Sequence, residues 1–142
     1  MVLESLDREQ ADALLSRQDA LQAGAARVVA ELRVLGLLGR VGAVEQHGSA
    51  VSGLMTWRDI DFAVIAPDVT GEVAFAALQP LLAHPRITAL RYVNELGARS
   101  FSGLARHERL FFMLYYDTAA GESWKLDISF WRSTERHGEA DA

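Results

Sequence analysis

The chain has 142 residues and a mass of 15.6 kDa; half of its residues are hydrophobic and 23% are charged, which is the balance of one globular domain rather than of a disordered segment. It contains no cysteine, which excludes a disulfide scaffold, a thiol nucleophile and cysteine-ligated metal sites. Its formal charge is −5 at pH 7 and its 14 basic residues are scattered, so it lacks the basic surface typical of nucleic-acid-binding proteins.

The N-terminal residues include several charges where a signal peptide would need an apolar run. No uncharged apolar stretch approaches the ~20 residues that cross a bilayer. We therefore expect a cytoplasmic protein without a membrane partner. The sequence leaves the oligomeric state open, a homodimer included.

The first predicted elements are helices within residues 5–38, where apolar side chains recur every three, four or seven positions. The recurring set is Leu14, Leu21, Ala25, Val28, Leu32 and Leu35. The pattern predicts two helices or one bent helix, with Gly24 as the weak point and Gly36 and Gly39 as the stop.

Two strands separated by a loop follow. Residues 41–46 are predicted to form a short strand. Residues 49–58 lack a clean period and contain Gly53, which indicates a loop with one helical turn. In residues 59–65 a period of two puts Asp59 and Asp61 on one face and Ile60, Phe62 and Val64 on the other, which is typical of a strand with one buried face.

A helix is predicted over residues 71–82. Thr70 can cap its N-terminus, and Glu72 is favourable in its first turn. Pro80 is expected to kink the helix or to end it one turn early.

The last part of the chain is predicted to be mostly strand. Residues 86–93 form one strand, and residues 94–107 form a long loop with some helix. Residues 109–116 and 123–131 form a hairpin, and the polar residues 132–142 form a flexible tail. The element order predicts an α+β fold in which helices back a mixed sheet of about five strands.

Three acidic residues, Asp59, Asp61 and Asp127, lie on predicted strands that are otherwise apolar. Alternation on the last strand puts Lys125, Asp127 and Ser129 on one face. Clustered carboxylates repel one another unless a cation neutralises them, and hard oxygen ligands favour Mg²⁺ or Mn²⁺. The alternative is that Asp59 and Asp61 form a solvated strand edge and that Asp127 pairs with Lys125 or an arginine.

The pair Gly48 and Ser49 strengthens the interpretation as a site. Ser49 precedes Asp59 by ten residues and follows a predicted strand, where small residues let N–H groups and a hydroxyl approach phosphate oxygens. Gly53 adds a second tight turn in the same loop. Three further charged side chains are candidates for lining the same site but are interpreted as surface charges: Arg58, Arg91 and Glu95.

Residues 48–53, the Asp59-Ile60-Asp61 motif and Asp127 together resemble the nucleotidyltransferase superfamily, which includes polymerase beta and antibiotic nucleotidyltransferases. The pattern is Gly-Ser, a spacer of about ten residues, Asp-x-Asp, and a third acid on a later strand. Within the superfamily the chain is similar to small bacterial nucleotidyltransferase-like proteins, over residues 41–131. The resemblance implies a mixed sheet backed by helices, with the acids at one edge of a nucleotide cleft.

The resemblance also implies a role for each residue of the motif. Asp59 and Asp61 would ligate two Mg²⁺ ions, and Asp127 would hold the ion beside the acceptor hydroxyl and help to remove its proton. Gly48 and Ser49 would hold the phosphates that leave as pyrophosphate.

One residue near the motif, Lys125, is a candidate ligand for a phosphate of the nucleotide. Its alternatives are a solvated strand lysine and a salt bridge to Asp127.

The function implied is transfer of a nucleotidyl group, with adenylyl expected, from a nucleoside triphosphate to a hydroxyl of a small molecule or protein. The chain is interpreted as one nucleotidyltransferase-like domain over residues 1–142, with a helical segment (1–40), a catalytic core (41–131) and the tail. Relatives usually continue into a helical acceptor-binding region, whereas this chain stops eleven residues after Trp131.

Two other functions stay open. One is a non-catalytic regulatory module that binds nucleotide or a partner, including the antitoxin-like minimal nucleotidyltransferase of a toxin–antitoxin pair. The other is a carboxylate-metal nuclease, which the net charge of −5 disfavours because a polyanionic substrate requires a basic surface.

Overall fold

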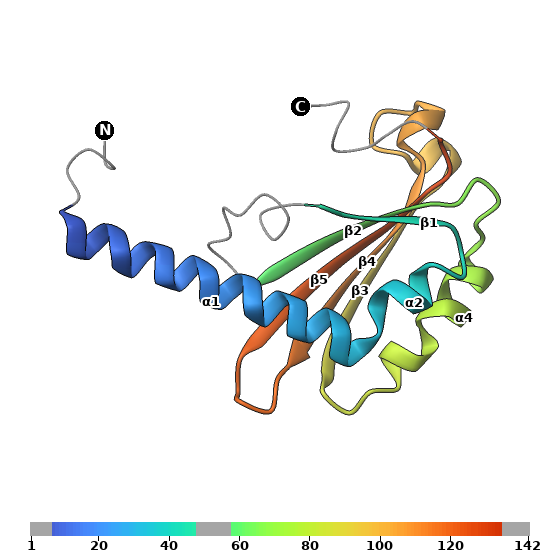
Figure 1. Ribbon diagram of the computed structural model, residues 1–142. Helices are drawn as coiled ribbons and strands as arrows, with labels where there is room; N and C mark the ends of the chain where they lie inside the picture. The colour runs from blue at the N-terminus through green and yellow to red at the C-terminus, as the bar shows by residue number, and fades with distance from the viewer. Residues whose placement is uncertain (1–6, 48–57, 135–142) are drawn as a thin grey trace.

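The computed structural model describes residues 7–47 and 58–134. Five strands of this part form one mixed sheet (Figure 1). They are β1 (Ala43–His47), β2 (Asp59–Ile65), β3 (Ile87–Glu95), β4 (Arg109–Asp117) and β5 (Ser123–Trp131). Their order is β1-β2-β5-β4-β3; β2 and β5 run parallel, and all other neighbours are antiparallel. The α+β fold with a five-stranded mixed sheet is thus confirmed.

Three α-helices pack on the same face of this sheet (Figure 1). They are α1 (Arg8–Leu32), α2 (Val34–Leu38) and α4 (Gly71–Leu82); two short 3-10 helices, η2 (Gly97–Arg99) and η3 (Ala105–His107), join β3 to β4. None of the helices in the described part of the chain is both long enough and apolar enough to span a membrane.

The break between α1 and α2 lies at Arg33, so the prediction that Gly24 is the weak point was wrong. Helix α1 runs through Gly24 without interruption. Arg33 adopts a left-handed backbone conformation, with φ 55° and ψ 37°, and serves as the C-cap of α1 and the N-cap of α2. Helices commonly end at such a residue, although glycine is the usual occupant because it has no Cβ.

Replacing Arg33 by glycine is expected to raise the free energy of unfolding by about 0.5–1 kcal/mol, because glycine adopts a positive φ without strain. Arg33 is exposed, so little packing is lost. Urea unfolding of the two proteins measures the change. Arg27→Gly, at an exposed position inside α1, is the control, and it should lower stability by about 1 kcal/mol.

Pro80 does not end α4 one turn early, which was one of its two predicted effects. The helix continues to Leu82, with Pro80 inside it. Proline removes one helical hydrogen bond, but Leu78 and Leu81, on either side of it, are both buried in the core. Packing of these side chains outweighs the local cost and keeps the last turn helical.

The hydrophobic core lies between the sheet and the helices. Alternate residues of the three central strands β2, β5 and β4 point toward the helices, as the period of two predicts. The buried ones are Ile60, Phe62, Val64, Leu110, Phe112, Leu114, Tyr116, Trp124, Leu126, Ile128 and Phe130. The opposite face, which carries Asp61 and Asp127 and which no described helix covers, is called the open face below.

Candidate functional site

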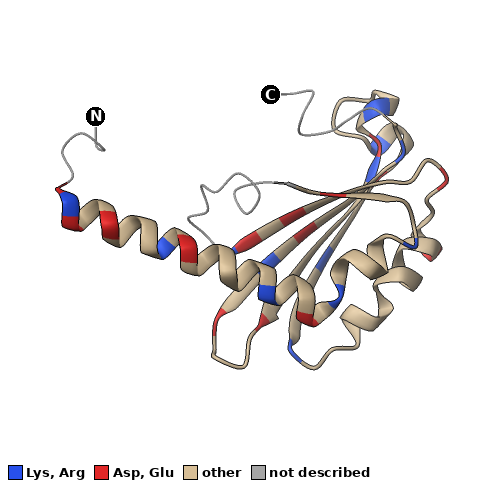
Figure 2. Ribbon diagram, in the orientation of Figure 1, with Lys and Arg blue, Asp and Glu red and all other residues tan. Residues whose placement is uncertain are grey.

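The predicted acidic residues lie side by side on two neighbouring strands at the centre of the sheet. In the parallel pairing of β2 and β5, Asp61 is the partner of Asp127 and Asp59 is the partner of Lys125. Figure 2 shows these charges on strands that otherwise carry few. Because partners in a sheet project to the same face, all four side chains lie on the open face. The pairing brings together residues that are 66 positions apart in the sequence.

Lys125 pairs with two of the acids. Its Nζ lies 3.5 Å from Oδ2 of Asp127 and 4.0 Å from Oδ2 of Asp59. The three side chains retain between 21% and 34% of their exposure, so they are reachable from solvent. Burial works against the ammonium, but attraction to Asp127 and Asp59 outweighs it and raises the pKa of Lys125. The salt bridge named as an alternative in the sequence is therefore present.

Asp61 is the most perturbed acid of the cluster. Burial, a hydrogen bond with Asp127, and repulsion from the charges of Asp127 and Asp59 together raise its pKa to about 6. Lys125 acts in the opposite direction without cancelling these effects. A proton between Asp61 and Asp127 therefore compensates part of the cluster's negative charge under mildly acidic conditions.

One carboxylate oxygen of Asp127 lacks a hydrogen-bond partner among the described residues. This oxygen, Oδ1, is buried. Buried carboxylate oxygens usually have a hydrogen-bond partner, so this atom is a candidate ligand for a cation. The donor set of Asp61 and Asp127 consists of carboxylate oxygens, which Mg²⁺ and Mn²⁺ accept.

The third predicted metal ligand is arranged differently. Among residues 7–47 and 58–134, no group of three or more histidine, cysteine, aspartate or glutamate side chains is arranged to hold a metal ion. Asp59 faces Lys125 instead. The described residues thus offer a divalent cation two neighbouring carboxylates, those of Asp61 and Asp127, and a cation bound by all three acids would have to displace the Lys125 ammonium.

A second polar cluster, which was not predicted from the sequence, adjoins the acids on the open face. Arg109 donates to Oε1 of Glu95 at 2.6 Å and to Oγ of Ser129 at 2.9 Å. Its guanidinium also lies 4.3 Å from the centre of the Phe111 ring. Glu95 was predicted to be a surface charge, which was wrong, because its side chain is only 17% exposed. These residues lie on β3, β4 and β5, and only the register of the three strands shows that they meet.

Two of the predicted phosphate ligands, Gly48 and Ser49, lie outside the described residues, as does Gly53. The predicted surface charge Arg58 is exposed and pairs with Glu122 at 3.4 Å. Arg91 is exposed on β3, as predicted.

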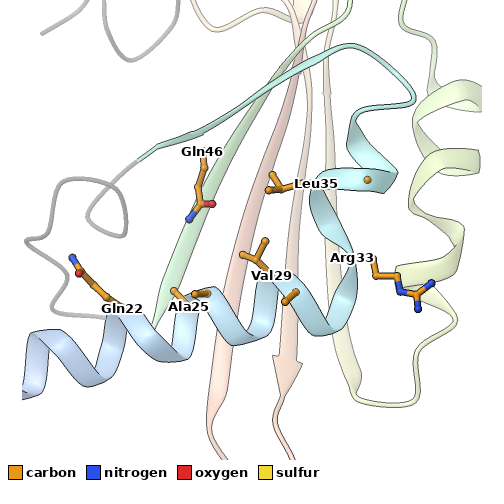
Figure 3. A pocket seen from close by; sticks show the side chains of 9 residues that line it. Gln22, Ala25, Val29, Arg33, Leu35 and Gln46 are labelled. Carbon is orange, nitrogen blue, oxygen red and sulfur yellow. The ribbon is translucent and has the colours of Figure 1, made fainter.

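A groove of about 460 Å³ lies between α1, α2 and β1 (Figure 3). Its lining is mostly apolar and includes Ala25, Val29 and Leu35. Gln46 contributes from the side of β1 that pairs with Phe62, whose side chain points into the core. This groove therefore lies on the helix-covered side of the sheet and does not contain the acids.

Comparison of the chain with models of known protein families and with curated proteins finds no match. The resemblance to nucleotidyltransferases thus rests on the motif residues and stays a prediction.

Proposed function

We propose that this protein transfers a nucleotidyl group, adenylyl as the expected one, from a nucleoside triphosphate to a hydroxyl of a small molecule or protein, with release of pyrophosphate. One observation supports the proposal most: the strand register that puts Asp61 next to Asp127, with Asp59 on the same strand. Asp-x-Asp followed by a distant strand acid is the superfamily pattern. The three acids can act on the same cations only if they are neighbours in space.

The proposed roles follow from the chemistry of phosphoryl transfer, which depends on positioning and charge neutralisation. Divalent cations, when bound, would neutralise charge on the attacking and leaving oxygens. Asp59 and Asp61 would hold them. Asp127, whose Oδ1 has no partner within the described residues, would hold the cation nearer the acceptor and accept the proton of the acceptor hydroxyl. Lys125 would leave its ion pairs and turn to a phosphate oxygen.

Transfer of label tests this proposal. The protein is incubated with Mg²⁺ and each α-³²P-labelled nucleoside triphosphate, alone and with host lysate, and label on a protein or small molecule is measured. Asp61→Asn is expected to lower transfer by a factor of about 100 or more, because it removes a ligand charge while keeping the shape.

Asp68→Asn is the matched control, since Asp68 is exposed in the turn after β2 and should leave transfer unchanged. Equal transfer by wild type and Asp61→Asn would contradict the proposed mechanism.

A second candidate function is a nucleotide-binding regulatory module without turnover. The ion pairs of Lys125 with Asp59 and Asp127 favour it, because they already compensate the charges that a catalytic cation would neutralise. This candidate predicts binding of nucleoside triphosphate that depends on Lys125, and no transferred label in any of the incubations.

A further inference from the structure

A second hollow, of about 420 Å³, lies between α1 and the N-terminal ends of β2 and β5. Its size is within the range of small-molecule sites. It adjoins the acid cluster, because Asp59 and Lys125 belong to both. Arg17 and Leu21 line it from α1, and Arg58, Tyr115 and Trp124 are among the residues that line it from the sheet.

The residues that line this hollow carry more positive than negative charges, the reverse of the chain as a whole. Three cations, Arg17, Arg58 and Lys125, line it against one acid, Asp59, in a chain whose net charge is −5. The mostly apolar groove of Figure 3 has a single cationic residue in its lining. Cations that gather around a concave surface next to an acidic cluster favour a ligand with several negative charges and a bound divalent cation.

The fold fixes the backbone of two of the three cationic residues. The backbone N–H of Lys125 donates to the carbonyl of Arg58 at 2.9 Å, which fixes Arg58 at the start of β2. The Arg58 guanidinium pairs with Glu122 at 3.4 Å, and both side chains are 46% exposed. Such an exposed pair is weak, so a polyanion can compete with Glu122 for Arg58.

We propose that this hollow binds the polyphosphate of a nucleoside triphosphate, with Arg17 of α1 and Arg58 contacting phosphate oxygens. The inference rests on the proposed function and extends it. Family resemblance assigns the phosphates to Gly48 and Ser49, whereas Arg17 and Arg58 form an additional set that makes α1 part of the substrate site. Lys125 joins the hollow to the acids, so the phosphates bind next to the carboxylates that hold the cation.

Inorganic tripolyphosphate in metal-free buffer at low salt is the probe, with binding measured by isothermal titration calorimetry. Arg17→Gln and Arg58→Gln are each expected to weaken binding about tenfold, which is typical for loss of one charge-assisted hydrogen bond. Arg8→Gln, an exposed position on the same helix, changes the net charge equally and should leave binding within about twofold.

Glu122→Gln is expected to change the affinity for tripolyphosphate in the opposite direction. It frees Arg58 from its ion pair and is expected to strengthen tripolyphosphate binding about threefold or more. Glu72→Gln, an exposed position in the first turn of α4, carries the same charge change away from the hollow and is the control. Equal effects of the two glutamate variants would mean that only net charge matters and would overturn the proposal.

Three other results would overturn it: no binding of tripolyphosphate to wild type, binding unaffected by Arg17→Gln, or equal affinity for tripolyphosphate and inorganic phosphate. Thermal melts of the variants check that these exposed substitutions leave the fold intact. A failure of the proposed function alone would look different. No label would be transferred, but tripolyphosphate would still bind in a manner that depends on Arg17 and Arg58.

Discussion

Replacing Asp61 by asparagine is expected to raise stability at neutral pH, by about 2 kcal/mol at pH 7.5 in the absence of divalent cations. Asparagine keeps the shape and a hydrogen-bond donor toward Asp127, and it removes a charge that burial and the charges of Asp127 and Asp59 disfavour. A substitution at a partly buried acid ordinarily destabilises a protein, so the sign of the change is informative.

The pH dependence follows from the raised pKa of Asp61, about 6 against the ordinary 3.8. Between these values the folded state holds a proton that the unfolded state has lost, so this group's contribution to stability falls as pH rises and levels off above about 6. Asparagine does not titrate. The advantage of Asp61→Asn should therefore be less than half as large at pH 4.5 as at pH 7.5.

Urea unfolding of both proteins at the two pH values, in EDTA, measures this difference. Asp68→Asn serves as the control, because its exposed side chain should give a change near zero at both pH values. If Asp61 instead has a structural salt-bridge role, Asp61→Asn will be less stable than wild type at pH 7.5.

The same variant separates a cation site from an acid cluster without function. Mg²⁺ with ATP or GTP should stabilise wild type by about 2.7 kcal/mol at a hundredfold excess over Kd, because a ligand that binds only the folded state adds its binding free energy. Asp61→Asn should lose most of this gain. Thermal melts in EDTA and in Mg²⁺ with nucleotide measure both effects, and a wild type that does not respond would contradict the proposed function.

The second prediction concerns Gly24, where α1 crosses β5. Gly24→Ala is expected to lower the free energy of unfolding by about 1–2 kcal/mol, although alanine is the better helix former by about 1 kcal/mol. A Cβ at this position would lie 2.7 Å from Cζ2 of Trp124, whose side chain is almost fully buried. The ring cannot move aside without disturbing the core, so helix and sheet must separate.

Gly36→Ala is the matched control, because a Cβ there meets nothing within 4 Å and α2 is helical at that position. It should raise stability by about 0.5–1 kcal/mol. Urea unfolding of both variants measures whether Gly24→Ala lowers and Gly36→Ala raises the free energy of unfolding. A Gly24→Ala protein that is more stable than wild type would show that the contact with Trp124 is loose.

The sequence by itself determined the elements whose pattern is local. The bounds of β2 and β5 agree with the predicted ranges, because a period of two in a half-buried strand depends only on which residues face the core. Helix α4 and the β4–β5 hairpin were predicted for the same reason. Alternation also put Asp59 and Asp61 on one face of one strand and Lys125 and Asp127 on one face of another.

The tertiary structure decided which of these residues meet. No local pattern states that β2 pairs with β5 in a register that puts Asp61 beside Asp127, or that Lys125 reaches both Asp127 and Asp59. A shift of one residue would turn every side chain of a strand to the opposite face, and only core packing prevents it.

Other features also became visible only in three dimensions. The Glu95–Arg109 pair needs the β3–β4 register, and the cationic hollow needs α1 beside the ends of two strands. The sequence predicts Gly24 to be a weak point of a helix, because helix propensity takes no account of contacts with other elements. Its place over Trp124 depends on how α1 crosses the sheet, which is a contact between segments 100 residues apart.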